Sequence, residues 1–237
     1  MVKKIVGTGV LLVLALALQA GVKMYTLKSP DGKVKLEVTA GQGIAYSLFY
    51  DGRLLLKPSR IALHTDLPEA DHWENIRITG TKQRHVSETV QAPFYRVKEF
   101  GIDCNELELR LNNGFSLLMR AYNDGMAYRF VAGRKGEMTV VEERAEFNFA
   151  DDFEAYIPYS TNPKDPWNMA FQNFYTKAPL TQYNTELPAF LPLTVDAGAV
   201  KLTLLESDLE AYPGMFVCGD GKTPALKGVF AAYPQET

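Results

Sequence analysis

The stretch at residues 106–130, ELELRLNNGFSLLMRAYNDGMAYRF, decides the fold class of this chain. Its first run, residues 106–111, alternates leucine with charged residues, so one face is apolar and the other polar. Turn residues follow at 112–114 and again at 123–125, and each turn leads into another strand-like run. The stretch therefore predicts three antiparallel strands in a meander.

The same pattern extends outward from this stretch along the chain. Residues 34–38 alternate apolar with charged side chains. Asp51-Gly52 predicts a tight hairpin, because both residues tolerate positive φ. Further strands are predicted at residues 46–50, 53–57, 139–149, 191–195 and 200–205. Helical periodicity is nearly absent, so the sequence predicts an all-β fold of antiparallel sheets with long loops.

Two segments differ from plain strands. Residues 64–90 are polar and carry all three histidines and Trp73, which predicts a long connection and one charged edge strand. Residues 160–188 contain three prolines and a run of aromatic residues, which predicts a long, packed loop and excludes a central strand. Long ordered loops often carry function, so this second segment is the first place to seek a site.

Composition supports one domain with a core. The chain has 237 residues, of which 46% are hydrophobic and 22% charged, and no composition break marks a linker. The net charge of −3 lacks the basic excess that binding a phosphate backbone requires. We therefore expect no nucleic-acid partner.

The N-terminus has the three parts of a secretory signal. Lys3 and Lys4 precede an apolar run at residues 5–18, and Ala20 offers a small residue at the cleavage position. The run is shorter than the roughly 20 residues needed to span a bilayer. We expect a signal peptide at residues 1–20, no membrane span, and an exported, periplasmic or secreted domain at residues 21–237.

Catalytic signatures are weak. Acidic clusters at residues 151–154 and 206–208 are more typical of solvated turns than of a glycosidase carboxyl pair. No histidine follows Ser160, which excludes a Ser-Asp-His triad in that chain order. The histidines and cysteines lack the spacing of a zinc site, and Cys104 and Cys218 either pair or remain free thiols. No catalytic residue is assigned.

Several motifs, in matching order and spacing, carry a family resemblance. They are LKSPDG at 27–32, RAYNDGMAYRF at 120–130, LP at 187–188 with LPL at 191–193, ESDL at 206–209, YPGM at 212–215 and GVFAAYP at 228–234. In these motifs the chain resembles the amino-terminal domain of glycoside hydrolase family 97, which includes retaining and inverting α-glucosidases and α-galactosidases.

The resemblance implies a β-super-sandwich of the galactose-mutarotase type, followed in the family by a catalytic (β/α)8 barrel. No strand-helix alternation of that kind occurs here, so the barrel is absent. We therefore expect a fragment that is inactive alone, whose parent is an exported glycoside hydrolase. In the parent this domain would pack on the barrel and shape the active-site pocket. The resemblance leaves open whether the last strands of the sandwich lie beyond residue 237.

One run of the family suggests site residues. Family members have a Phe-Glu-Asn-x-Tyr-like loop whose Glu ligates calcium, and residues 171–175 are similar, with Gln172 in the place of that Glu. The resemblance implies calcium as the cofactor of the parent, with Gln172 as a ligand and most other ligands in the barrel. Asn173 and Tyr175 of the same run, with Trp167 before it, are the candidate carbohydrate-binding residues; aromatic residues also serve as buried loop anchors.

Two other functions remain open. A free-standing carbohydrate-binding module would use the aromatic residues Trp167, Phe171, Phe174 and Tyr175. A mutarotase-like enzyme needs an acid and a base converging on one concave face, which the few histidines disfavour. If a barrel docks on this domain, an apolar patch is expected to be exposed where it would sit.

Overall fold

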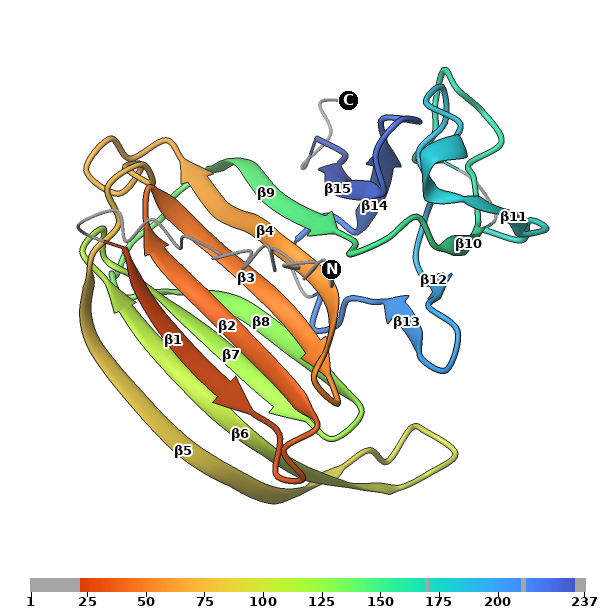
Figure 1. The fold of residues 1–237 in the computed structure, drawn as a ribbon. Coiled ribbons are helices and arrows are strands. Elements are labelled where there is room, and N and C mark those ends of the chain that lie inside the picture. The colour runs from red at the N-terminus through yellow and green to blue at the C-terminus, as the bar shows by residue number, and fades with distance from the viewer. Residues whose placement is uncertain (1–21, 169–170, 210–211, 233–237) are drawn as a thin grey trace, which may run out of the picture.

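The computed structural model describes residues 22–168, 171–209 and 212–232. The predicted signal peptide lies outside these residues. The regular secondary structure of the described residues consists of antiparallel strands in three sheets and a single 3-10 turn (Figure 1). The predicted all-β antiparallel sandwich is confirmed.

The largest sheet has the strand order β1-β2-β3-β4-β9-β15-β14. Its strands are β1 (Lys23–Lys28), β2 (Val34–Gly41), β3 (Gly43–Tyr50), β4 (Arg53–Thr65), β9 (Val140–Asn148), β14 (Met215–Gly219) and β15 (Ala225–Phe230). The predicted hairpin joins β3 to β4, where Tyr50 pairs with Arg53. Asp51 and Gly52 have φ of 48° and 78°, the left-handed conformation that this tight turn requires.

The second sheet has the order β5-β6-β7-β8 and contains the predicted meander. Its strands are β5 (Ile78–Gln91), β6 (Glu99–Leu111), β7 (Phe115–Tyr122) and β8 (Gly125–Ala132). The polar segment before the meander forms a connection at residues 66–77 and then the edge strand β5, as predicted. Trp73 anchors this connection, because its ring is buried and its Nε1 donates a hydrogen bond to the Leu63 carbonyl oxygen at 3.0 Å.

The core lies between these two sheets. Leu36 and Tyr46 of the large sheet and Leu107, Leu117 and Met119 of the meander are essentially removed from water. Alternation places every second side chain of these strands on the inner face, so the apolar half of the pattern is buried. Each such side chain contributes roughly 1.5–3 kcal/mol from burial, which explains how the chain folds without a disulfide scaffold.

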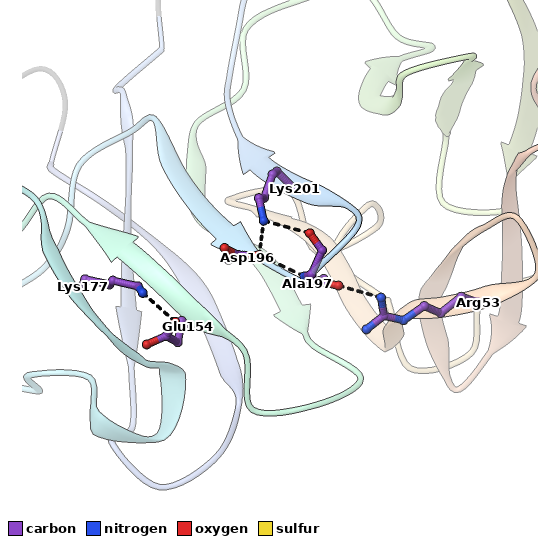
Figure 2. Close-up of polar contacts among 7 residues, drawn as sticks. Arg53, Glu154, Lys177, Asp196, Ala197 and Lys201 are labelled. Atoms are coloured by element: carbon purple, nitrogen blue, oxygen red, sulfur yellow. Dashed lines mark hydrogen bonds and ion pairs between the residues drawn. The ribbon is translucent and has the colours of Figure 1, made fainter.

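The third sheet has the order β11-β10-β12-β13 and lies beside β9, β14 and β15 (Figure 1). Its strands are β10 (Glu154–Ile157), β11 (Thr176–Pro179), β12 (Leu193–Asp196) and β13 (Lys201–Leu204). Arg53 attaches it to the β3–β4 hairpin, since its Nη1 donates to the Ala197 carbonyl oxygen at 2.6 Å (Figure 2). The Arg53 guanidinium also lies 5.5 Å from the ring centre of Phe153.

Some elements differ from the sequence prediction. Residues 160–188 are mostly loop, as predicted, but they include the edge strand β11 and the 3-10 turn η1 (Leu180–Gln182). Strands β14 and β15 were not predicted, because short runs with glycine give little alternation. Cys104 and Cys218 are free thiols, which resolves the open alternative. Within the described ranges, no helix has the length and apolar character needed to cross a membrane.

Candidate functional site

The connection between β10 and β12 carries all the predicted site residues. It leaves β10 at Ile157, returns through β11 as an edge strand, and enters β12 at Leu193. Two isolated bridges, from Ala189 to Tyr159 and to Val217, attach its later half to its start and to β14. The connection is therefore long in sequence but held at several points.

Backbone geometry singles out Phe171 within this connection. Its φ is +55°, a left-handed conformation that bulky side chains rarely adopt. The ring packs edge-on against Phe190, with centres 5.4 Å apart, and lies 6.1 Å from Phe216. These contacts hold the unusual conformation, and the side chain of the next residue, Gln172, is exposed. Unfavourable backbone geometry of this kind is concentrated at functional sites.

The structure places the predicted sugar-binding residues in mostly supporting positions. The Trp167 ring packs edge-on against Phe216, with ring centres 4.8 Å apart. The Asn173 side-chain amide donates to the Tyr159 carbonyl oxygen at 2.6 Å, and the Tyr175 hydroxyl donates to the Pro192 carbonyl oxygen at 3.2 Å. These contacts make Trp167 and Asn173 loop anchors, whereas Tyr175 keeps 43% of its surface exposed.

A groove of about 640 Å³ opens beside these anchors. Its lining consists of hydroxyl, amide and apolar side chains without a charged group: Tyr159, Ser160, Thr161, Gln172, Asn173, Phe174, Thr176, Ala178, Gln182, Asn184 and Leu187. Phe174, at the rim, is fully exposed. Hydroxyl and amide groups both donate and accept hydrogen bonds, as sugar hydroxyls do, and an exposed ring offers an apolar face. The groove is suited to a neutral, polar ligand.

Ser160 has an unused polar group close to the groove. Its side chain is 1% exposed, and its Oγ has no hydrogen-bond partner among the described residues. Buried hydroxyls are usually paired, so this unpaired one, behind the lining of the groove, is an exception. From the sequence, Ser160 is a candidate only for a nucleophile, and Gln182 and Asn184 are not candidates at all. No sequence signal indicated them, because the fold alone brings residues 159–161 beside residues 182–187.

The family resemblance leads us to expect a calcium site, and the described residues supply at most one ligand for it. Gln172 is exposed at the groove and offers a neutral amide oxygen, which calcium accepts. Calcium takes six to eight oxygen ligands, usually including carboxylates. Among the described residues, no group of three or more His, Cys, Asp or Glu side chains is arranged to hold a metal. The residues present fit a single ligand contributed to a site that is completed elsewhere.

The first acidic cluster has structural roles. Asp152 accepts hydrogen bonds from the Thr181 amide at 3.0 Å and the Thr181 hydroxyl at 2.6 Å, which tie the start of η1 to the end of β9. Glu154 pairs with Lys177 at 2.8 Å across β10 and β11, and Asp196 pairs with Lys201 across β12 and β13 (Figure 2). These ion pairs lie on the solvent side of the third sheet, away from its apolar face. They stabilise strand register and leave no carboxyl group poised for catalysis.

The second acidic cluster contains a partly buried carboxyl group. Glu206 accepts a hydrogen bond from the Met215 amide at 2.8 Å, and burial raises the pKa of Glu206. Asp208 forms an ion pair with Arg129 at 3.6 Å. Burial also raises the pKa of Glu143 on β9, and the charge of Glu206 raises it further. Neither glutamate lines the groove formed by the β10–β12 connection, and neither is assigned a catalytic role.

His64 and His85 do not form a shared site. His64 on β4 binds Asp71 at 2.7 Å, whereas His85 on β5 binds Asp103 at 3.1 Å. The two strands belong to different sheets. An acid and a base for anomer interconversion must converge on one face. The arrangement of these two histidines therefore gives the mutarotase-like alternative no support.

Comparison with known sequences gives two informative matches. The chain matches the family described as Glycosyl-hydrolase 97 N-terminal over residues 27–234. A retaining alpha-galactosidase from Bacteroides thetaiotaomicron is 39% identical over 229 residues, which cover 94% of this chain and 34% of that protein. A probable retaining alpha-galactosidase from Streptomyces bingchenggensis is 26% identical, covering 65% of this chain and 24% of that protein. The chain spans about a third or less of the length of these relatives.

Solved structures share the fold. A glycoside hydrolase family 97 enzyme from Pseudoalteromonas sp. strain K8, in complex with acarbose, superposes with a TM-score of 0.71 at 18% identity, covering 87% of this chain and 32% of that one. A beta-arabinopyranosidase superposes with a TM-score of 0.74 at 20% identity, covering 89% of this chain and 36% of that one. At such low identity the likeness establishes the sandwich fold alone.

Proposed function

Because the chain belongs to glycoside hydrolase family 97 and contains the amino-terminal domain of that family, we propose that it is the non-catalytic sandwich domain of an exported hydrolase of α-galactosides or α-glucosides. In this role it packs on a catalytic barrel and forms one wall of the active-site pocket. The observation that carries the proposal is the uncharged groove next to Phe171, lined by hydroxyl and amide side chains, with the exposed ring of Phe174 at its rim.

The chemistry of the groove supports contact with a sugar. Its hydroxyl and amide groups match the hydrogen-bonding groups of a neutral saccharide. The exposed ring of Phe174 would cover an apolar sugar face. The wall therefore binds and positions substrate, while bond cleavage belongs to the barrel.

Exposed apolar side chains support packing on a further domain. Phe174 is fully exposed, Phe171 is 49% exposed, and Leu205 and Leu209, which follow β13, are 66% and 46% exposed. Apolar side chains left exposed on a surface are available for contact with a further domain, and we propose that these four contact the barrel. The relatives are about three times as long as this chain, which leaves ample sequence for a docking domain.

Gln172 is the one residue of this chain that we propose as a calcium ligand. We propose that its amide oxygen supplies one neutral ligand to a calcium ion whose remaining ligands come from the barrel. The missing negative charge would weaken calcium affinity relative to a carboxylate at this position. Gln172→Glu in a full-length protein is therefore expected to tighten calcium binding, measured by titration calorimetry, and unchanged affinity would contradict the assignment.

A chimeric enzyme tests the proposed function. This chain replaces the matching third of the Bacteroides thetaiotaomicron relative, and hydrolysis of a p-nitrophenyl α-galactoside is measured. We expect the chimera to be active and Phe174→Ala to lower kcat/KM about tenfold, since stacking on one ring contributes about 1 kcal/mol or more. The matched control is Phe94→Ala, which removes an equally exposed ring that is distant from Phe174 in the sequence. Equal activity of both variants, or hydrolysis by the isolated chain, would contradict the proposal.

The second candidate function is a free-standing carbohydrate-binding module. The full exposure of Phe174 favours it, because a binding module needs an accessible ring. Saturable binding of galactose or maltose by the isolated chain, abolished by Phe174→Ala in a calorimetric titration, would support this reading. If the sugar is bound only by the chimera, the result supports the proposed role of this domain as one wall of the active-site pocket.

A further inference from the structure

Strand β5 is an unusually long free edge. It forms one margin of the second sheet, with β6 on one side and no strand on the other among the described residues (Figure 1). It has 14 residues, whereas the opposite edge strand β8 has 8. Its pairing with β6 keeps an unbroken register from Gly80 to Gln91. A long, regular edge presents unpaired backbone groups to another strand.

The distal half of β5 and β6 forms an arm that projects beyond the sandwich (Figure 1). Nearly every residue from 87 to 103 is exposed, on both faces of the ribbon. Its apolar side chains are Val90, Phe94, Tyr95, Val97 and Phe100, exposed by 43% to 98%. A two-stranded ribbon with no covered face is marginally stable in water, so this arm is expected to be covered by a partner.

The sequence of β5 is complementary to itself when two copies run antiparallel about His85. In that register Lys82 of one copy lies opposite Glu88 of the other, twice by symmetry. Both side chains are exposed, and neither forms an ion pair within the described part of the chain. A register centred one residue later would instead place Arg84 opposite Glu88, but Arg84 is already bound to Glu106 at 2.6 Å.

We propose that β5 pairs antiparallel with β5 of a second copy of this chain, with the two-fold axis at His85, so that two four-stranded sheets become continuous. Lys82 and Glu88 share the face that also carries Arg84, so both new ion pairs lie on one side of the joined sheet. In this register, the aromatic residues at the tip of each β5–β6 arm extend beyond Ile78 of the other copy. They point toward the connection at residues 66–77 of that copy. A single contact therefore pairs the free edge and adds a third strand to the two-stranded arm.

Charge reversal tests the pairing. The chain without its predicted signal peptide is expected to sediment as a concentration-dependent dimer. Lys82→Glu and Glu88→Lys each place like charges opposite one another and should weaken the dimer at least tenfold. The double variant restores opposite charges and should recover the dimer, whereas Lys57→Glu, at an exposed position on β4, should change nothing. Circular dichroism confirms that each variant is folded.

A cysteine tests the register. Only residue 85 faces its own copy, so His85→Cys in a Cys218→Ser background should form an intermolecular disulfide under mild oxidation, and Ser87→Cys should not. A chain that remains monomeric up to high concentration would overturn the proposal and leave the arm to a different protein or a further domain. A dimer that survives both charge reversals would also overturn it, since another surface would then hold the copies together.

Discussion

One glutamate on the outer face of the β5–β8 sheet and one on the inward side of β9 are both shielded from water. The pKa of the first is lowered, whereas the pKa of the second is raised. On the sheet face, the Glu106 side chain is 6% exposed. Its two oxygens accept hydrogen bonds from Arg84 Nε at 2.6 Å and Arg120 Nε at 2.8 Å. Burial acts to raise the pKa of Glu106, but the two arginines outweigh it and hold the pKa below its usual range.

On β9, Glu143 has no arginine. Its Oε2 accepts a hydrogen bond from the Tyr212 hydroxyl at 2.8 Å. Burial raises the pKa of Glu143, and the negative charge of Glu206 raises it further. The comparison teaches that the neighbours of a buried acid, more than burial itself, decide whether it carries charge at neutral pH. Substitutions at the two glutamates and at their partners test this difference.

Arg120→Ala should have the largest effect. It leaves one oxygen of a buried carboxylate without a partner, which is expected to lower the free energy of unfolding by about 2 kcal/mol. Urea denaturation measures the change. Arg110→Ala is the control, because that arginine is 59% exposed and 3.7 Å from Glu108. If both variants lose the same stability, the two-arginine arrangement around Glu106 does not matter for folding.

Tyr212→Phe should have a smaller effect. It removes the hydroxyl that donates to Glu143 and is expected to lower the free energy of unfolding by about 1 kcal/mol. Tyr175→Phe provides the control, since the Tyr175 hydroxyl makes a 3.2 Å hydrogen bond on an exposed side chain. A loss no greater than that of the control would show that Glu143 does not depend on this hydroxyl.

Glu143→Gln should have the smallest effect, with the opposite sign at neutral pH. A raised folded pKa means that the stability linked to this group is complete below the unfolded pKa of about 4.3 and is lost as pH rises through the folded value. The neutral variant avoids that loss, so its Tm should exceed that of the wild type by about 1–2 °C near pH 8 and converge with it near pH 4.

Glu106→Gln sharpens the contrast. A lowered folded pKa means that the stability linked to Glu106 is present above the unfolded pKa and is lost as pH falls through the folded value. This variant should therefore be less stable than the wild type at neutral pH and approach it in acid. Parallel pH profiles for the Glu106 and Glu143 variants would contradict the assigned pKa directions.

Much of the sandwich follows from local sequence. The alternation at residues 106–111 predicts the buried face of β6, where Leu107 and Leu109 are essentially inaccessible. Asp51-Gly52 predicts the β3–β4 turn, since only certain residues adopt its positive φ values. In contrast, β15 pairs with β9 across a long sequence separation, with β14 on its other side, and no local pattern specifies such a partner.

The candidate site was predictable only in outline. The aromatic and proline content of residues 160–188 indicated a packed functional loop, and Gln172 and Asn173 do line the groove. Trp167 was assigned to sugar binding, but its ring packs against Phe216, 49 positions later in the chain. The unpaired hydroxyl of Ser160 has no sequence signal, because hydrogen-bond satisfaction depends on which distant groups the fold brings near.

Strand periodicity, the tight turns and the family of this chain follow from local sequence, since each depends on residues that are neighbours along the backbone. Tertiary contacts set which acids carry charge, which aromatic rings are exposed and where a groove opens. Those properties depend on the distance between groups far apart in the chain, and electrostatic and packing energies change steeply with that distance. The opposite pKa directions of Glu106 and Glu143 show this most directly.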